Sequence, residues 1–216
     1  MSERASNSRP LQVRALRILG AEQRRVETTV RCPRRDASIP ASLCMACCDC
    51  DGVSAAGDHT YVLCSHPGAA ADGPDSSSDA PMAARAADAV RLCDIMTADV
   101  VCVLADHPLA HLLEVVLQKR LATMVVVDAD GRPIGLVMRS ALAQRLDRKT
   151  AADVMIPVPF VLHETASLTD AAMLVAYQAI DHMPVVSAEG RMVGMLASSD
   201  VCRLVNGAPR ESRMAR

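Results

Sequence analysis

Aromatic residues are almost missing from this sequence: its 216 residues include two tyrosines, one phenylalanine and no tryptophan. Half of the residues are nevertheless hydrophobic, so a globular core has to be built from aliphatic side chains. The length suffices for one good core, or for a core with a small satellite module. Composition therefore predicts a globular protein with a core of Val, Leu, Ile, Met and Ala.

Long apolar runs and a strong net charge are missing too. No stretch approaches the roughly 20 apolar residues that a bilayer crossing takes, and a polar, Arg-rich N-terminus is not typical of a signal peptide. The net charge of −2 gives the whole chain no electrostatic preference for nucleic acid. We therefore expect a cytoplasmic protein without membrane contact, whose nine cysteines stay reduced and favour metal binding over disulfides.

Catalytic signatures are also absent. The sequence has neither a P-loop nor a GxGxxG pattern. No nucleophile–base pairing stands out, and His107, His111 and His163 lack the spacing of metal ligands. The sequence therefore predicts a protein that is not an enzyme. One alternative stays open, a thiol redox role for residues 47–50, which read Cys-Cys-Asp-Cys.

Composition divides the chain into segments. Residues 1–29 are predicted to be a basic tail with a weak helical pattern, and residues 30–66 hold six of the nine cysteines. Residues 67–91 are small and polar, which predicts a flexible linker. From residue 92 the apolar density stays high, up to a short C-terminal tail, 207–216. The helical pattern of the first segment consists of Leu11, Val13, Leu16, Ile18 and Leu19.

The apolar part of the chain contains an internal repeat. Asp94-Ile95-Met96 recurs as Asp153-Val154-Met155, an offset of 59 residues. The same offset pairs Leu109 with Leu168, Val116 with Val175, Met124 with Met183, Val126 with Val185, Val127 with Val186, Ala129 with Ala188, Gly131 with Gly190, Gly135 with Gly194 and Ser140 with Ser199. A gapless register over about 50 positions predicts two copies of one structural unit, residues 92–148 and 151–206.

Each copy is predicted to follow the order β-α-β-β-α, in a mixed α/β (α+β) fold. Short β-branched runs indicate strands, helical spacing of leucines and valines indicates helices, and Asp130-Gly131 and Glu189-Gly190 are turn signals. Ser167 or Thr169 is expected to cap the second long helix. The predicted elements are strands 100–104 and 158–162, helices 109–120 and 168–180, strands 124–127 and 183–186, strands 134–138 and 192–197, and helices 140–146 and 199–205. One copy alone is marginal, so the two are expected to pack sheet to sheet around one core as a pseudo-symmetric module.

These residues resemble the CBS domain, named for cystathionine β-synthase, and the tandem resembles a CBS pair, or Bateman module. The resemblance covers about half of the chain, residues 92–206. It is carried by Asp94-Ile95-Met96-Thr97 and residues 128–137 in the first copy, and by residues 153–155, 182–186 and 190–200 in the second. The resemblance implies a regulatory module that binds an adenosine nucleotide such as AMP or ATP between its repeats and forms a flat homodimer.

The resemblance also implies where a nucleotide binds. In the family a Gly begins the last strand, a Ser or Thr ends it, and a following Asp accepts the ribose hydroxyls. The first copy has Met138 and Ala141 at the last two places, so its site is expected to be degenerate. The second copy has Ala197 and Asp200 there, which leaves one competent site. Its candidate residues are Asp200, Ser199, Gly194, Met155, Pro157 and Pro184.

Structural roles are the alternative for several of these residues. Asp200 suits the first turn of a helix, where a carboxylate is favoured by the helix dipole. Gly135 and Gly194 suit strand geometry rather than ligand contact. His182 stands beside a strand-entry proline and is expected at the rim of a pocket or on the surface.

The cysteine segment contains the spacing C-x₂-C twice, which lets two thiolates grip one ion across a tight turn. Strands are expected at 26–31 and 60–64, with so little apolar core that an ion would supply the folding energy. The segment loosely resembles a small zinc ribbon, and an iron–sulfur cluster or a disordered metal-free tail is the alternative. The candidate ligands are Cys32, Cys44, Cys47, Cys50 and Cys64, whereas Cys48 is a spare and Cys93, Cys102 and Cys202 are expected to be buried hydrophobes.

The sequence therefore predicts a non-catalytic sensor that binds an adenosine-type nucleotide or a protein partner. The alternative is a zinc-dependent nucleic-acid-binding or transcription-linked regulator, because nine arginines lie within residues 1–35. They are Arg4, Arg9, Arg14, Arg17, Arg24, Arg25, Arg31, Arg34 and Arg35. Asp49, Asp51 and Asp58 dilute this charge, so we expect a solvated tail and no nucleic-acid partner.

Overall fold

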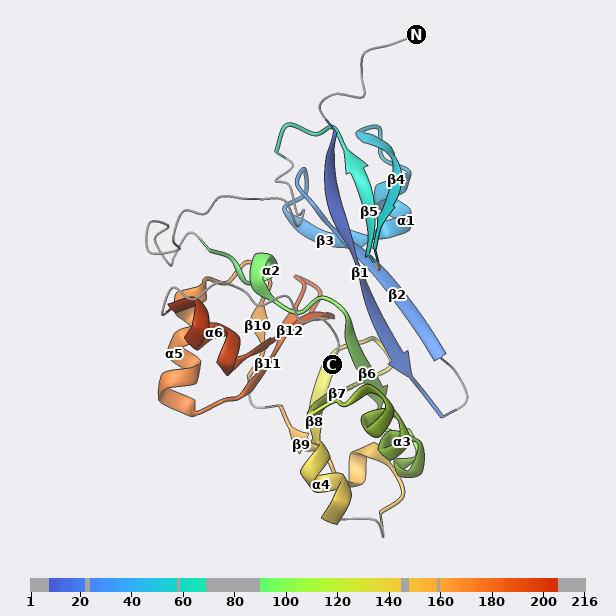
Figure 1. Cartoon of the computed structure of the whole chain (residues 1–216), viewed down its shortest axis with the longest axis vertical. Helices are drawn as coiled ribbons and strands as arrows, with labels where there is room; N and C mark the ends of the chain where they lie inside the picture. Colours follow the sequence, from blue (N-terminus) through green and yellow to red (C-terminus); the bar gives the residue numbers. More distant parts are fainter. Residues whose placement is uncertain are drawn as a thin grey trace.

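The computed structural model describes residues 8–21, 24–57, 59–68, 90–144, 148–158 and 160–205. In Figure 1 the N-terminal strands stand above, and the two repeats lie below them on either side. Most of the predicted linker, 67–91, and all of the predicted C-terminal tail, 207–216, lie outside the described residues. Among those that are described, no helix combines the length and the apolar character that a membrane crossing needs.

The first repeat, residues 92–148 (repeat 1), follows the predicted order closely. The β-branched runs form its strands, and Leu109, Leu112 and Val116 bury one face of its long helix. That helix ends where Arg120 takes the left-handed conformation, with φ at 50°. The elements are α2 Leu92–Ile95, β6 Val100–Leu104, α3 Leu109–Lys119, β7 Thr123–Val127, β8 Pro133–Met138 and α4 Arg139–Gln144.

The second repeat, residues 151–206 (repeat 2), departs from prediction at its first strand. The expected strand 158–162 is reduced to Leu162–His163, because residues 156–158 pair with β8 of repeat 1 instead. Ser167 caps the long helix as expected, in a capping box with Asp170. The elements are a 3₁₀ turn Ala151–Asp153, β9 Ile156–Pro157, β10 Leu162–His163, α5 Leu168–Gln178, β11 His182–Val186, β12 Met192–Ala197 and α6 Ser198–Val205.

The expectation of a basic tail with helical character is wrong for the described part of residues 1–29. Arg9–Leu19 is an eleven-residue strand, β1, and the strand after it, β2, begins at Arg24. Leu16 and Ile18 are spaced by two, and both are buried on one face of β1 together with Arg14. The N-terminal module therefore spans residues 9–64. Its elements are β1 Arg9–Leu19, β2 Arg24–Cys32, β3 Ala37–Pro40, α1 Ala41–Met45, β4 Cys50–Ala56 and β5 His59–Cys64.

The N-terminal module and repeat 1 share one sheet. Its strand order is β3-β2-β1-β6-β7-β8-β9, and β5 attaches β4 to β1. The junction is parallel pairing of β1 with β6, from Leu16 opposite Val100 to Leu19 opposite Val103. Repeat 2 has a separate sheet, β10-β11-β12. The N-terminal module, expected as a small satellite beside the core, is thus continuous with the sheet of repeat 1 (Figure 1).

The apolar core has several parts instead of the single one expected. Each repeat has an aliphatic cluster to which the start of the other repeat contributes: Leu92 and Ile95 join the cluster of repeat 2, and Ala151 and Val154 join that of repeat 1. A further cluster lies between the two sheets, where β1 adds Leu16 and Ile18 to Cys102 of repeat 1 and Met192 of repeat 2. Cys93 and Cys102 are buried as predicted, but Cys202 is exposed on α6, so that expectation is wrong.

Candidate functional site at the seam of the two repeats

The two repeats exchange short segments at their seam. Ile156 of β9 pairs with Leu136 of β8, so the start of repeat 2 extends the sheet of repeat 1. Thr97 pairs in turn with Met195 of β12, through backbone hydrogen bonds of 2.8 and 2.9 Å. Thr97 corresponds to Ile156, and Leu136 to Met195, at the offset of 59 residues. The start of each repeat therefore completes the sheet of the other.

Two glycines make this exchange possible. A Cβ atom on Gly194 would lie 2.3 Å from the Sδ atom of Met96, and one on Gly135 would lie 2.6 Å from the Sδ atom of Met155. Neither contact is compatible with a side chain unless the methionine moves. Both glycines therefore permit close packing of the exchanged segments. This is a structural role, as the alternative to ligand contact predicted for Gly135 and Gly194.

Contacts along the hairpins show the same internal symmetry. Thr123 Oγ1 lies 3.5 Å from His182 Nδ1, and these two residues are one repeat offset apart. Nε of Arg132 donates to the Glu189 carbonyl at 3.4 Å, and the Met192 amide donates to the Gly131 carbonyl at 2.9 Å. The contact of the equivalent residues Thr123 and His182 is the one expected where a pseudo-twofold axis passes between the two repeats, and the other two contacts join the hairpins close to it.

The predicted nucleotide residues of repeat 2 lie together. Pro184 and Gly194 are buried on the neighbouring strands β11 and β12. Ser199 is exposed and Asp200 partly exposed in the first turn of α6, which directly follows β12. Ser198 is occupied, because its Oγ donates to Asp181 at 3.1 Å.

The carboxylate of Asp200 stands apart from this local network. Among the described residues it makes no hydrogen bond or ion pair, so it does not cap α6. Helix α6 begins at Ser198, directly after β12, and this places the backbone of Asp200 close to the end of that strand. A partly exposed carboxylate at a helix start is therefore free, within the described structure, to accept hydrogen bonds from a ligand.

Two of the predicted residues belong to the other side of the seam. Met155 packs against Gly135, and Pro157 pairs with Gly135 across the strands β8 and β9, so neither accompanies Asp200. The corresponding segment beside Gly194 contains Met96 and Thr97. The sequence analysis assigned Met155 and Pro157 to the nucleotide site of their own repeat, repeat 2. The exchange of segments places both residues against repeat 1. The 59-residue offset, applied across the repeats, is the signal that could have found Met96 and Thr97.

The arginines of the N-terminal module are partly internal, which corrects the expectation of a solvated tail. Arg14 is 6 % exposed, and its Nη2 donates to the Cys93 carbonyl at 2.7 Å. On β1, Arg17 forms an ion pair of 2.5 Å with Asp99. These arginines bind other parts of the same chain, so they no longer argue for nucleic-acid binding.

Arg31 joins the N-terminal module to repeat 2. Its Nη1 lies 3.1 Å from Oε1 of Glu164, as an ion pair without the angle of a hydrogen bond, and its Nη2 contacts Asp36 at 2.5 Å. Glu164 is fully buried and also accepts hydrogen bonds from the amide and the hydroxyl of Ser38. Arg91 and Arg31 hold the pKa of the Asp36 carboxyl below its usual value, with the Arg91 hydrogen bond as the largest cause. A charged cluster thus links β2 and β3 to repeat 2.

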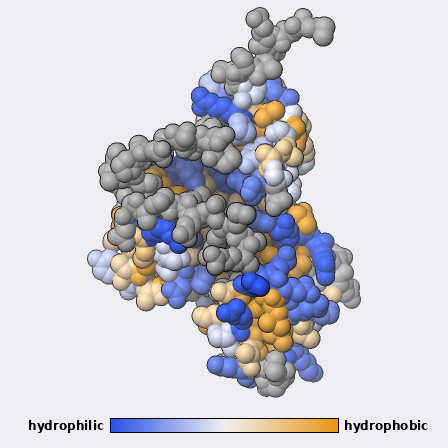
Figure 2. Space-filling model, viewed as in Figure 1, coloured by the Kyte–Doolittle hydropathy of each residue, from blue (hydrophilic) through white to orange (hydrophobic). Residues whose placement is uncertain are grey.

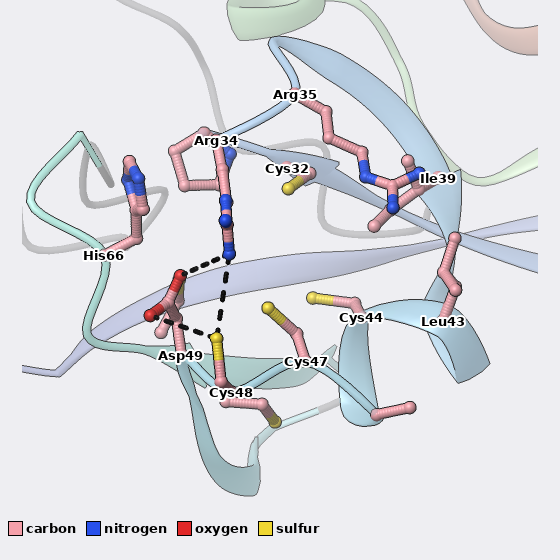
Figure 3. Close-up of a pocket in the computed structure, with 14 residues that line it drawn as sticks. Cys32, Arg34, Arg35, Ile39, Leu43, Cys44, Cys47, Cys48, Asp49 and His66 are labelled. Carbon is pink, nitrogen blue, oxygen red and sulfur yellow. Dashed lines mark hydrogen bonds and ion pairs between the residues drawn. The ribbon is translucent and has the colours of Figure 1, made fainter.

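The predicted metal ligands surround a cavity of about 250 Å³ in the N-terminal module. Figure 3 shows the sulfurs of Cys32, Cys44 and Cys47 directed towards this space. The wall also includes Arg34 at the rim. All five predicted ligands, Cys32, Cys44, Cys47, Cys50 and Cys64, line the cavity, and Cys48 does so as well.

Comparison with known proteins decides the family. The model of the CBS domain matches residues 92–148 and 151–207, just over half of the chain. This chain belongs to the CBS domain family. The two matched segments are the two repeats, so the chain contains a CBS pair, in agreement with the resemblance deduced from the sequence.

Individual relatives match only part of the chain. The CBS domain-containing protein CBSX2, chloroplastic, of Arabidopsis thaliana is 34 % identical over 64 residues, which are 30 % of this chain and 27 % of that protein. A crystal structure of CBSX2 in complex with AMP is 26 % identical, covers 54 % of this chain and 96 % of its own, and has a TM-score of 0.48. The CBS domain of a bacterial CNNM/CorC family Mg²⁺ transporter has a TM-score of 0.52 at 18 % identity, and it covers 58 % of this chain and 80 % of its own. The chain thus matches less than a third of the curated relative, and the last structure supports the CBS-pair fold.

Proposed function

We propose that this chain is a non-catalytic regulatory protein whose CBS pair binds one adenosine nucleotide at the seam, beside Asp200. Membership of the CBS family supports a sensing role, and the related CBSX2 has been crystallised with AMP. The observation that carries the proposal is the carboxylate of Asp200, which is partly exposed and without a partner among the described residues. It lies one helical turn after β12, the strand that receives Thr97 from repeat 1.

The chemistry of this place suits a nucleoside phosphate. A carboxylate has two oxygens that accept hydrogen bonds from the two ribose hydroxyls. The amides at the start of α6 attract a phosphate, and the exposed hydroxyl of Ser199 adds a donor there. Ala197 takes the place of the usual Ser or Thr, so Ser199 would supply the hydroxyl that this position lacks.

The opposite position of the seam has no such carboxylate. Met138 ends β8, and Ala141 occupies the place in α4 that corresponds to Asp200. We therefore expect one nucleotide per chain, bound on the side of repeat 2. This stoichiometry distinguishes the proposal from a pair with two equal sites.

The test is calorimetric titration of the full chain with AMP, ADP, ATP and S-adenosylmethionine, together with the variant Asp200→Ala. Losing hydrogen bonds to a charged acceptor costs about 1.5–3 kcal/mol each, so the affinity should fall roughly tenfold or more. The matched control is Asp130→Ala, an exposed acid in the hairpin turn of repeat 1. No binding of any of the four compounds, or equal binding by both variants, would refute the proposal.

We further infer that two copies associate through the outer helices of the CBS pair. Leu117 on α3 is 64 % exposed, and Met173 and Tyr177 on α5 are 53 % and 74 % exposed. Figure 2 shows hydrophobic surface around α3 and α4 at the bottom of the view. Exposed apolar side chains on outer helices are typical of an association surface.

Light scattering on the purified chain tests this association. The wild type should have the mass of a dimer, and Tyr177→Lys combined with Met173→Lys should shift it to the mass of a monomer. Val53→Lys, at an exposed apolar residue of β4 in the N-terminal module, is the control and should remain dimeric. A monomeric wild type would leave the surface to a different protein partner and would contradict the homodimer.

A further inference from the structure

The cysteine cavity of the N-terminal module is built by four separate elements. Cys32 ends β2 and Cys64 ends β5, whereas Cys44 lies in α1 and Cys47 in the turn after it. The turn is tight, because the Cys47 amide donates to the Cys44 carbonyl at 3.0 Å and the Cys50 amide donates to the Cys47 carbonyl at 3.2 Å. Two strand ends and one knuckle thus bring thiols to a common space.

Burial separates these cysteines from ordinary surface thiols. Cys32, Cys44 and Cys64 are 7 %, 4 % and 6 % exposed, and all three belong to the aliphatic cluster around Val30 and Val62. None of the nine cysteines forms a disulfide. Ionised thiolates in such apolar surroundings need a counter-charge, which a bound cation supplies.

The two remaining cysteines of the segment have other partners. Cys48 is exposed, its sulfur accepts from Arg34 at 3.7 Å and donates to Asp49 at 3.8 Å, and Figure 3 shows this triad at the edge of the cavity. The thiol of Cys50 donates to the Gly52 carbonyl at 3.8 Å. Both side chains are thus engaged locally.

A smaller group of potential ligands lies at the same edge. In the described part of the chain, Cys47, Cys48 and Asp49 form the group whose ligand atoms lie within 4.8 Å of one another, so a zinc ion would have to draw the sulfurs of Cys32, Cys44 and Cys64 closer to that of Cys47. Cys48 and Asp49 are already held by Arg34, and Cys48 is open to solvent. The group therefore has the features of a surface ion-pair cluster, and Cys47 is the member that also faces the buried thiols.

We propose that Cys32, Cys44, Cys47 and Cys64 bind one zinc ion in a closed, tetrahedral tetrathiolate site. Four thiolates with a C-x₂-C knuckle form the ligand set of structural zinc, and the ion supplies the positive charge that the buried thiolates require. Arg34 and Arg35 at the rim of the cavity offset the excess negative charge of the site.

Zinc at this place would brace more than the cysteine segment. Cys32 directly follows Arg31, the residue that reaches the buried carboxylate of Glu164 in repeat 2. The ion would therefore fix the end of β2 and, through it, the contact between the N-terminal module and the CBS pair. The site is structural in this proposal and leaves no coordination position open for catalysis.

Metal analysis of the full chain, purified under reducing conditions, is the first test. The expected content is about one zinc per chain, because a closed four-ligand site holds one ion. Cys44→Ser and Cys47→Ser should lose it, whereas the matched controls Cys48→Ser and Cys50→Ser should keep it. Zinc retained by Cys44→Ser, or lost by Cys48→Ser, would overturn the assignment of ligands. Iron with acid-labile sulfide in place of zinc would overturn the assignment of the metal as zinc.

A spectroscopic test covers variants that fail to fold. The wild-type chain is stripped of metal with a chelator under reducing conditions and titrated with Co²⁺. One equivalent should produce the strong visible bands of tetrahedral cobalt and a thiolate-to-metal charge-transfer band, and zinc should displace them. The weak spectrum of octahedral cobalt, or no change on titration, would refute the tetrathiolate site.

Discussion

The two repeats hold the N-terminal module in different ways. Repeat 1 does so with its backbone, because β6 and β1 form a parallel ladder. Repeat 2 pairs its equivalent strand, β10, with β11 and reaches the module through side chains: the buried Glu164, Met192 packed with β1, and the ion pair of Arg191 with Glu27. A ladder tolerates most side-chain changes, whereas contacts through side chains depend on the residues that make them. The attachment to repeat 2 is therefore the more sensitive of the two.

The repeats also divide their chemical roles. Repeat 1 has Ala141 where repeat 2 has Asp200, and repeat 1 carries the extra strand where repeat 2 has a two-residue edge strand. Each repeat still has an aliphatic cluster, so the differences lie at sheet edges and helix starts. The two copies thus share their core and differ in the pairing of their first strand and in the residue at the start of the last helix.

Among the variants that test the difference between the two repeats, Glu164→Ala should have the largest effect on the free energy of unfolding. The change leaves the buried Arg31 with only the exposed Asp36 as a partner and removes the acceptor of the Ser38 amide and hydroxyl, which costs about 3 kcal/mol or more in the free energy of unfolding. Urea denaturation at neutral pH measures it. The control is Asp99→Ala, which breaks the exposed ion pair with Arg17 and should cost at most about 1 kcal/mol. Equal stabilities for both variants would show that repeat 2 does not depend on this carboxylate.

The two seam glycines should differ in their tolerance. Gly194→Ala should cost about 1–3 kcal/mol, because its Cβ meets Met96, which is 5 % exposed and has little room to move. Gly135→Ala should cost less, since Met155 is only partly buried. Thermal unfolding of both variants, and of Gly194→Ala combined with Met96→Ala, measures the difference. A double variant that recovers none of the loss would contradict the close packing of the two residues.

The helix caps predict the smallest difference. Ser167 caps α5 with a side-chain hydrogen bond, whereas Pro108 begins α3 without one. Ser167→Ala should therefore destabilise repeat 2 by about 1 kcal/mol. Ser140→Ala, an exposed serine within α4, is the control and should change stability by less than about 0.5 kcal/mol. Chemical denaturation distinguishes the two, and equal effects would argue against the capping box.

Local pattern was sufficient for most of the CBS pair. Runs such as Met124-Val125-Val126-Val127, bounded by a turn glycine, have one stable arrangement in a half-buried sheet, and β7 lies where they predict it. The N-terminal strand was not predictable in this way, because its apolar residues contain helical spacings, such as Leu16 to Leu19, as well as the alternating spacing of Leu16 and Ile18. Pairing with β2, β5 and β6 selects the strand, and those partners are remote in sequence.

The sequence by itself determined the duplication, the family and the carboxylate at Asp200, because each depends on residue identities at a fixed offset. Only the tertiary structure decided which segment pairs with β12, that Arg31 reaches Glu164, and that β1 joins two parts of the chain in one sheet. The physical reason is that strand pairing and buried ion pairs join residues far apart in the chain. Their backbone groups and charges find these partners only in the folded state.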